Sequence, residues 1–289
     1  MSSAATTRQN STAEPLVEAK GLTKKFPLAW DFFGRPTRWR VAVDDVSLSI
    51  QRGQTVGLVG ESGSGKSTLG RLILRLLPAS AGTVRFDEVD VTHAGPAELR
   101  RFRQRAQIVF QDPYGSLDPR FNVEDIVAEG MTHLHLSSAA RHKRVLELLE
   151  LVRLPRNTVD RFPHEFSGGQ RQRISIARAL AVDPEFIVAD EPVSALDVSM
   201  QSQVLNLMRE LQERLSLTYL FISHDMAVVR FMADRVAVMT DGKLVEVGVA
   251  DQVLSHPHHA YTKSLLDSVP SLLRGLTPER MRNDARQAF

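Results

Sequence analysis

The apolar positions of this chain follow two periods, one typical of strands and one typical of helices. Apolar, β-branched runs at Thr55–Val59, Phe186–Ala189 and Thr218–Ile222 have the length of buried strands. Leucine and isoleucine recur at helical spacing in Thr68–Leu77, and Val198–Leu215 carries an apolar stripe along one side. Because strands and helices alternate, the pattern predicts an α/β fold with a parallel core sheet.

Further segments extend this prediction toward both ends of the chain. Short strands are expected at Leu16–Lys20, Val41–Ile50, Thr83–Phe86, Gln107–Val109, Arg235–Thr240 and Lys243–Val247. Helical patterning covers Asn122–Glu150 and returns at Phe166–Ala181. Between the first two strands lies Pro27–Arg40, an aromatic and basic insertion.

Composition narrows the class of protein. With 289 residues and 43% hydrophobic content, the chain can form one large domain or two small ones. Its 36 basic and 34 acidic residues are mixed along the sequence, so no general nucleic-acid-binding surface is indicated. The absence of cysteine excludes disulfides and cysteine-ligated metal centres.

The two ends of the sequence indicate tails. No apolar run reaches the roughly 18–20 residues that span a bilayer. The polar stretch Met1–Glu14 lacks the apolar segment of a secretory signal. We therefore expect a soluble, cytoplasmic protein with a disordered tail at 1–14 and a second tail at 271–289.

The clearest chemical motif is Gly60–Ser67, which reads Gly-Glu-Ser-Gly-Ser-Gly-Lys-Ser and fits a phosphate-binding loop. A predicted strand precedes it and a predicted helix follows it. Glycines allow backbone N–H groups to surround phosphate oxygens, and the helix start adds a positive dipole end. Lys66 supplies a charge and Ser67 a hydroxyl for Mg²⁺, so the motif predicts a nucleoside triphosphate site.

Two other motifs are informative mainly in combination with this loop. Asp190 and Glu191 end a predicted strand, where one carboxylate can hold Mg²⁺ and the next can polarise an attacking water. The alternative is a solvated acidic turn. Ser167–Gln170 opens a predicted helix and is either an anion site or an ordinary serine N-cap with flexible glycines.

Taken in order, these motifs resemble the ATP-binding subunit of an ABC transporter. The set consists of Gly60–Ser67, Gln111, Ser167–Gln170, Asp190 with Glu191, Ser194–Asp197, and His224. The resemblance covers Leu16 to about Pro270, with Phe166 where leucine is usual. It implies a P-loop cassette over 15–270, with a RecA-like mixed core sheet, an antiparallel β subdomain and a helical subdomain at about 112–180.

Other stretches resemble the dipeptide, oligopeptide and nickel importer branch of that family. They are Gln111–Arg120, Asp190–Ser199, and the C-terminal His256–Thr262, where Ala260 replaces the usual proline. The insertion Pro27–Arg40 most resembles the second of the two ATPase subunits of these importers. Members often carry a cysteine-ligated iron–sulfur cluster near this end, which a chain without cysteine cannot form.

The resemblance also implies residue roles. The ATP phosphates would contact the loop residues Gly60, Ser62, Gly63, Ser64, Gly65, Lys66, Ser67 and Thr68. Mg²⁺ would be held by Ser67, Gln111 and Asp190. Gln111 would sense the metal or the attacking water, Glu191 would act as general base, and His224 would orient the water. A capping role is the alternative for His224. Phe26 is the candidate for stacking on adenine, with Trp39 as its competitor.

In the family, two cassettes face each other head to tail. Ser167, Gly168, Gly169 and Gln170 would complete the site of the opposing subunit, and Asp197 would communicate across the interface. The implied partners are a second ATPase subunit, identical or different, integral-membrane permease subunits and, indirectly, an extracytoplasmic binding protein, with no nucleic acid. The implied location is peripheral, on the cytoplasmic face of the inner membrane.

The function that we expect is ATP-driven import, most simply of di- or oligopeptides. The alternatives are import of nickel or another small solute, a soluble ATPase acting on nucleic acid or ribosomes, and a regulatory module without turnover. Two basic clusters each have two possible interpretations. His256, His258 and His259 are solvated or bind metal, and Arg100, Arg101, Arg103 and Arg105 form a solvated helix face or contact anionic lipid or nucleotide.

Overall fold

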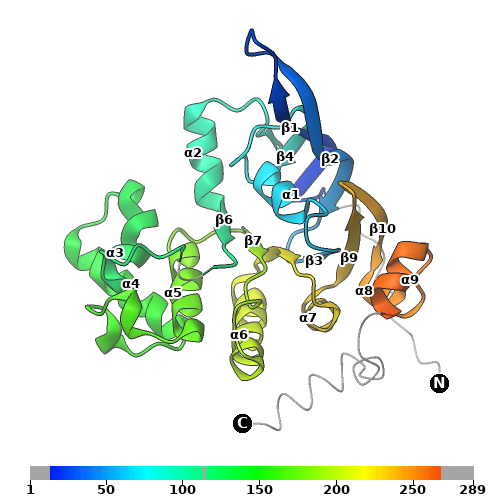
Figure 1. Ribbon diagram of the computed structural model, residues 1–289. Coiled ribbons are helices and arrows are strands. Elements are labelled where there is room, and N and C mark those ends of the chain that lie inside the picture. The colour runs from blue at the N-terminus through cyan, green and yellow to red at the C-terminus, as the bar shows by residue number, and fades with distance from the viewer. Residues whose placement is uncertain (1–13, 113–114, 268–289) are drawn as a thin grey trace, which may run out of the picture.

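Two β-sheets organise the part of the chain that the computed structural model describes, residues 14–112 and 115–267 (Figure 1). The larger sheet has the strand order β10-β9-β3-β8-β7-β6. Its strands are β3 (Thr55–Val59), β6 (Ala106–Val109), β7 (Phe186–Asp190), β8 (Thr218–Ile222), β9 (Arg235–Thr240) and β10 (Lys243–Val249). All neighbours pair in parallel except β10, which is antiparallel to β9. The predicted parallel core is therefore confirmed.

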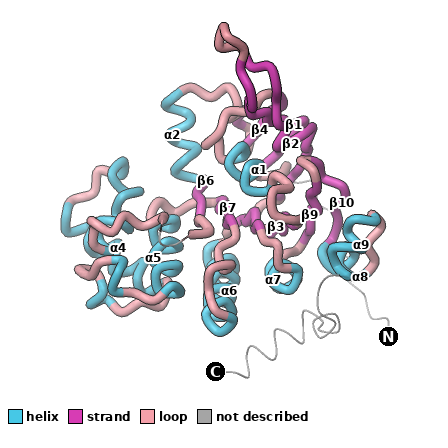
Figure 2. Tube along the Cα trace, viewed as in Figure 1, coloured by secondary structure: helices cyan, strands magenta, loops and turns pink. Residues whose placement is uncertain are grey.

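The smaller sheet is antiparallel, in the order β2-β1-β4-β5. Its strands are β1 (Val17–Trp30), β2 (Pro36–Ile50), β4 (Ala81–Phe86) and β5 (Val89–Asp90). The insertion Pro27–Arg40 continues β1 and β2 as a hairpin that ends where Trp30 pairs with Pro36. This hairpin projects from the described chain in Figure 2. The sequence did not indicate it, because its strands are held by cross-strand pairing and not by an alternating buried face.

The helices form two groups. A helical region on one side of the sheets contains α3 (Val123–Ala128), α4 (Ser138–Leu151) and α5 (Gly168–Leu180), with the 3-10 turns η1 (Glu129–Leu134), η2 (Arg156–Thr158) and η3 (Pro163–Glu165) (Figure 1). The others are α1 (Lys66–Ile73), α2 (Pro96–Arg105), α6 (Val198–Leu215), α7 (Met226–Met232), α8 (Ala250–Ser255) and α9 (Ala260–Asp267). Helices and 3-10 turns thus make up most of the described residues between 112 and 180.

Helix α1 is shorter than its apolar pattern predicts. It ends at Ile73 and not at Leu77, and Arg75 then adopts a left-handed conformation with φ of 55°. The Arg75 guanidinium donates a 2.7 Å hydrogen bond to the Thr92 carbonyl. Pro78 disfavours a helical Leu77, so the apolar spacing continues past the end of the helix.

Alternation along the core strands decides which apolar cluster each side chain joins. Val188 on β7 and Leu220 on β8 pack with α1 and the antiparallel sheet. Their neighbours Ala189 and Phe221 face the opposite side and pack with α5 and α6. The core sheet is therefore buried on both faces, as continuous apolar strands require.

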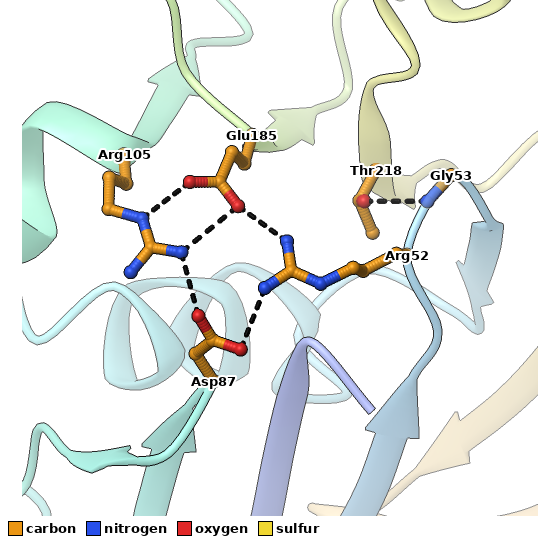
Figure 3. A network of polar contacts seen from close by, with 6 residues as sticks. All are labelled: Arg52, Gly53, Asp87, Arg105, Glu185 and Thr218. Atoms are coloured by element: carbon orange, nitrogen blue, oxygen red, sulfur yellow. Dashed lines mark hydrogen bonds and ion pairs between the residues drawn. The ribbon is translucent and has the colours of Figure 1, made fainter. Parts of the chain in front are cut away.

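A charged network joins the two sheets at the edge where the core strands begin (Figure 3). Arg52 and Arg105 each pair with both Asp87 and Glu185, at nitrogen–oxygen distances of 2.5–2.9 Å. Beside it, the Gly53 N–H donates to the Thr218 hydroxyl at 2.9 Å. Arg105 is therefore an ion-pair partner, and the interpretation of its basic run as a solvated helix face does not hold for this residue.

Candidate active site

A cavity of about 590 Å³ lies where the parallel core strands end. It is lined by Phe26, Leu28, Arg40, Ala42, Ser62, Gly63, Gly65, Lys66, Ser67, Thr68, Gln111, Glu191 and His224. The last three follow β6, β7 and β8, whose carboxyl ends share one edge of the sheet. Such an edge is where ligands bind in parallel α/β sheets. The structure thus brings most of the predicted site residues together.

Glycine is required at two positions of the phosphate loop. A Cβ on Gly60 would lie 2.0 Å from the Met239 carbonyl oxygen, and one on Gly65 would lie 2.2 Å from that of Ala42. Gly65, with φ of 109°, also forms the left-handed N-cap of α1. The loop therefore presses against β2 and β9, and its N–H groups can face an anion.

Lys66 lies at the base of this loop and is only 4% exposed. Its ammonium donates to the carbonyl oxygens of Gly60 at 2.7 Å and Glu61 at 2.8 Å. Burial lowers the pKa of Lys66, while the nearby Glu191 and Asp190 partly oppose that shift. A triphosphate is a suitable partner for this buried cation. The nearby Ser64 hydroxyl is buried and has no hydrogen-bond partner among the described residues.

A hydroxyl and a carboxylate mark the predicted magnesium position. Ser67 donates a 2.7 Å hydrogen bond to Asp190, whose side chain is nearly buried. Burial raises the pKa of Asp190, and the Ser67 hydroxyl and the Arg71 guanidinium, 4.0 Å away, oppose this effect. Two hard oxygen donors beside a phosphate loop fit Mg²⁺, which prefers oxygen ligands together with substrate phosphates.

Glu191 is the centre of a second polar group. Gln111 donates a 3.1 Å hydrogen bond to its Oε2, and His224 Nδ1 lies 3.1 Å from the same oxygen. The Glu191 side chain is 12% exposed and that of His224 is 53% exposed. A carboxylate, an amide and an imidazole thus converge on one wall of the cavity.

The aromatic side of the cavity is formed by the base of the β1–β2 hairpin. Phe26 lines the cavity, and its cross-strand partner Arg40 lines it too. Trp39 is not among the lining residues and is 48% exposed. This placement favours Phe26 over Trp39 as the adenine platform.

The serine–glycine turn does not line the cavity of its own chain. Ser167 caps α5 and accepts from Gln170 N–H, while the Gln170 side chain accepts from the Ser167 N–H. A Cβ on Gly169 would lie 2.9 Å from Met200 Sδ, so this glycine lets α5 approach α6 closely. Asp197 caps α6 and likewise lies outside the cavity lining. Ser167 is therefore the N-cap of α5, and it is exposed.

Several residues lie at the site although no sequence pattern predicted that position. Leu28 and Arg40 reach the cavity only because the insertion is a paired hairpin. Tyr261 on α9 accepts a 3.0 Å hydrogen bond from the Glu61 N–H in the phosphate loop. Its position in the C-terminal motif was visible, but its contact 200 residues away along the chain was not.

Two histidines of the C-terminal motif are held in place by hydrogen bonds from their backbone N–H groups. Glu246 accepts hydrogen bonds from the N–H groups of His258 and His259 at 2.8 and 3.1 Å. Burial acts to raise the pKa of Glu246, but hydrogen bonds to its carboxylate, these two among them, outweigh that effect and lower the pKa. Within residues 14–112 and 115–267, no group of three His, Asp or Glu side chains is arranged to hold a metal ion.

The comparison with known families decides the identity of the fold. Residues 43–194 match the ABC transporter family, and residues 245–287 match the C-terminal region of oligopeptide and dipeptide transporters. The chain belongs to the ABC transporter family. As a member of it, this cassette is an ATP-binding protein and an ATPase.

Curated relatives cover most of the cassette. It is 56% identical over 234 residues to the dipeptide transport ATP-binding protein DppF of Lactococcus lactis, covering 80% of this chain and 75% of the relative. It is 51% identical over 279 residues to the oligopeptide transport ATP-binding protein OppF of Bacillus subtilis, covering 96% of this chain and 88% of the relative.

Solved structures confirm the expected cassette fold. A dimeric ATP-binding cassette in a post-hydrolysis state, bound to ADP and Pi, matches with a TM-score of 0.71 and 30% identity, covering 81% of this chain and 98% of that one. CbiO1 from Clostridium perfringens matches with a TM-score of 0.72 and 26% identity, covering 84% and 92%. In the described ranges of the cassette, no helix combines the length and apolar character needed to cross a membrane.

Proposed function

We propose that this chain is the ATP-hydrolysing motor subunit of an importer for di- or oligopeptides. The observation that carries the ATPase assignment is the convergence of Glu191, Gln111 and His224 on the cavity that contains Lys66. The peptide assignment is supported by relatives named for dipeptide and oligopeptide transport, and by the matching C-terminal region. None of these names favours nickel, nucleic acid or ribosomes.

Nucleotide binding uses the phosphate loop and the hairpin base. The loop N–H groups and the Lys66 ammonium hold the β- and γ-phosphates, and Phe26 stacks on adenine. Mg²⁺ would be held by Ser67, Asp190 and Gln111. When bound, this ion offsets phosphate charge during transfer. Aromatic stacking on a base contributes on the order of 1–3 kcal/mol, so most of the affinity comes from the phosphate contacts.

Hydrolysis depends on the carboxylate of Glu191. A water held beside it attacks the γ-phosphorus, and the bond from that phosphorus to the β–γ bridging oxygen breaks. Glu191 accepts a proton from the water, and His224 and Gln111 hold the water and the carboxylate in line. General-base action of this kind typically contributes 10²–10⁴-fold in rate.

A second cassette completes the site. Ser167 is exposed and does not line the cavity of its own chain, which leaves its hydroxyl available to a nucleotide held by an opposing subunit. ATP bound between two subunits would favour the closed pair. Moving such an equilibrium from 1:99 to 99:1 takes about 5.5 kcal/mol of differential binding. Loss of the γ-phosphate contacts on hydrolysis then reopens the pair.

The remaining partners are permease subunits in the membrane and, through them, an extracytoplasmic binding protein. The surface after Gln111, toward the helical region, is the proposed contact with the permease. The cassette would then sit peripherally on the cytoplasmic face of the inner membrane. The second ATPase subunit is either a copy of this chain or a different cassette.

Peptide uptake in cells tests this proposal. Cells that lack the chain should lose uptake of a labelled tripeptide, and the wild-type gene should restore it. Lys66→Ala should not restore it, because the phosphates lose their cationic partner. Nickel uptake measured in the same cells is the control and should not change. Restored tripeptide uptake with Lys66→Ala would contradict the proposed motor role.

A further inference from the structure

The end of the β1–β2 hairpin, residues 28–41, presents aromatic side chains to solvent. We call it the hairpin arm. Phe32 is 98% exposed, Phe33 81%, Trp30 58% and Trp39 48%. The arm projects beyond the sheets in Figure 1. Isolated exposed apolar residues are ordinary, but four exposed aromatic rings on one short hairpin indicate an interaction site.

The charged side chains of the arm are mostly basic. Arg35, Arg38 and Arg40 lie on it, and Asp31 is the only acidic residue between positions 19 and 43. The Asp31 carboxylate is engaged inside the turn, where it accepts from the N–H groups of Phe33 and Arg35 at 2.9 and 2.8 Å. The arm therefore presents cations around its aromatic rings and suits an anionic surface.

Several backbone N–H groups of the turn have hydrogen-bond partners within the turn itself. Asp31 N–H donates to the Arg35 carbonyl at 2.8 Å, and Gly34 N–H donates to the Asp31 carbonyl at 3.1 Å. With the two bonds to the Asp31 carboxylate, these satisfy the turn N–H groups of residues 31, 33, 34 and 35. Satisfied backbone groups lower the cost of moving the turn toward acyl chains.

We propose that the hairpin arm inserts into the headgroup region of an anionic phospholipid bilayer. Phe32 and Phe33 enter at the tip, the two tryptophans lie at the interface, and Arg35 and Arg38 contact lipid phosphates. Tryptophan is enriched at membrane interfaces, and basic residues bind anionic leaflets. A convex tip with rings on its apex and no acidic rim suits a flat, deformable surface better than a pocket on a protein.

This interaction is separate from ATP hydrolysis and would add a direct lipid contact to the proposed peripheral location. The chain contains two tryptophans, Trp30 and Trp39, and both lie on the arm. Their fluorescence therefore reports on the arm alone. The test titrates the full-length protein, without nucleotide or permease, with vesicles of phosphatidylcholine or of phosphatidylcholine with phosphatidylglycerol.

We expect a blue shift of tryptophan emission and co-sedimentation with the anionic vesicles, both weakened by salt, and neither with the neutral vesicles. Phe32→Ser with Phe33→Ser should remove the blue shift. Each basic residue near an anionic leaflet contributes about fivefold in partitioning, so Arg35→Ser with Arg38→Ser should weaken vesicle binding by about 25-fold. Leu76→Ser, at a 44% exposed position outside the arm, is the matched control and should bind like the wild type.

The proposal is overturned if anionic vesicles leave the emission unchanged, or if the arm variants bind them as tightly as the control. It is also overturned if the emission shifts only when a second ATPase subunit is added, because the arm is then a protein interface. Because no nucleotide or permease is present, none of these results bears on the ATPase or the import assignment.

Discussion

At the scale of single residues, two adjacent carboxylates at the end of β7 have different surroundings. Asp190 accepts from the Ser67 hydroxyl, while Glu191 contacts Gln111 and His224. The separation depends on the backbone, since Glu191 has a left-handed φ of 49° and its N–H donates to the Ile222 carbonyl. A non-glycine residue in this conformation is strained, and such strain is concentrated at functional sites.

Glu191→Gln should separate ATP binding from hydrolysis. The amide keeps the shape of the side chain but cannot accept the proton of water, so we expect hydrolysis to fall by about 10² or more. ATP affinity should stay within a few-fold of the wild type. Phosphate release and equilibrium nucleotide binding measure the two effects. Glu150→Gln, in the helical region, is the control. Turnover close to normal in Glu191→Gln would remove this residue from the mechanism.

Tyr261→Phe tests the contact between α9 and the phosphate loop. The substitution removes one acceptor from the Glu61 N–H and keeps the ring. A hydrogen bond of this kind is worth about 1 kcal/mol, so ATP affinity should fall by roughly fivefold. Isothermal titration with ATP measures the change, and thermal unfolding shows whether the helix remains docked. An unchanged affinity would mean that α9 does not support the loop.

At the scale of elements, β2 acts as a wall for the phosphate loop. Gly65 lies against the Ala42 carbonyl, and Asp44 N–H donates to the carbonyl of Gly242 in the β9–β10 turn at 2.8 Å. The antiparallel sheet therefore sets the position of both the loop and Phe26. A shift of β2 would move the phosphate and adenine contacts together.

Gly65→Ala should damage this arrangement more than a matched glycine change elsewhere. Gly53, in the turn before β3, also has a positive φ, but a Cβ there meets nothing within 4 Å. Gly53→Ala should thus cost about 1 kcal/mol of stability from backbone strain alone. Gly65→Ala adds a clash with β2 and should lower ATP affinity at least tenfold. Urea unfolding and ATP titration compare them, and equal effects would contradict the role of β2.

At the scale of the whole molecule, the network of Arg52, Asp87, Arg105 and Glu185 joins the antiparallel sheet to the starts of β6 and β7 (Figure 3). Hydrogen bonds from Arg105 and then Arg52 hold the pKa of Asp87 below its ordinary value. The hydrogen bond from Arg105 likewise lowers the pKa of Glu185, against a smaller opposing effect of burial. Both carboxylates are bound as anions.

This network should make stability depend on acid pH. Because the folded pKa values of Asp87 and Glu185 lie below the unfolded ones, the stabilisation is present above the unfolded values and disappears as pH falls through the folded ones. The side chains are more than a third exposed, so solvent screening limits each pair to about 0.5–1 kcal/mol. In urea unfolding, Glu185→Gln should be less stable than the wild type at pH 7, and the difference should shrink by pH 3. A constant difference would contradict the assignment.

Much of the site was predictable because its motifs are local. The phosphate loop, Asp190 and His224 each follow a strand with a clear apolar pattern, and the shared edge of a parallel sheet brings such residues together. The lengths of β1, β2 and α1 could not be predicted from the sequence in the same way. The hairpin depends on pairing between strands, and α1 ends where Arg75 contacts Thr92.

The sequence by itself determined the chemistry of this protein: a loop of glycines with Lys66 and Ser67, two carboxylates after a buried strand, and a histidine after the next. Residue type and short spacing suffice to predict it, because the groups that would contact phosphate lie within eight consecutive residues. The tertiary structure alone decided that Phe26 and Arg40 line the cavity, that Tyr261 reaches the loop, and that the serine–glycine turn does not. Those facts depend on contacts between segments far apart in the chain, which strand pairing and burial fix and local pattern does not record.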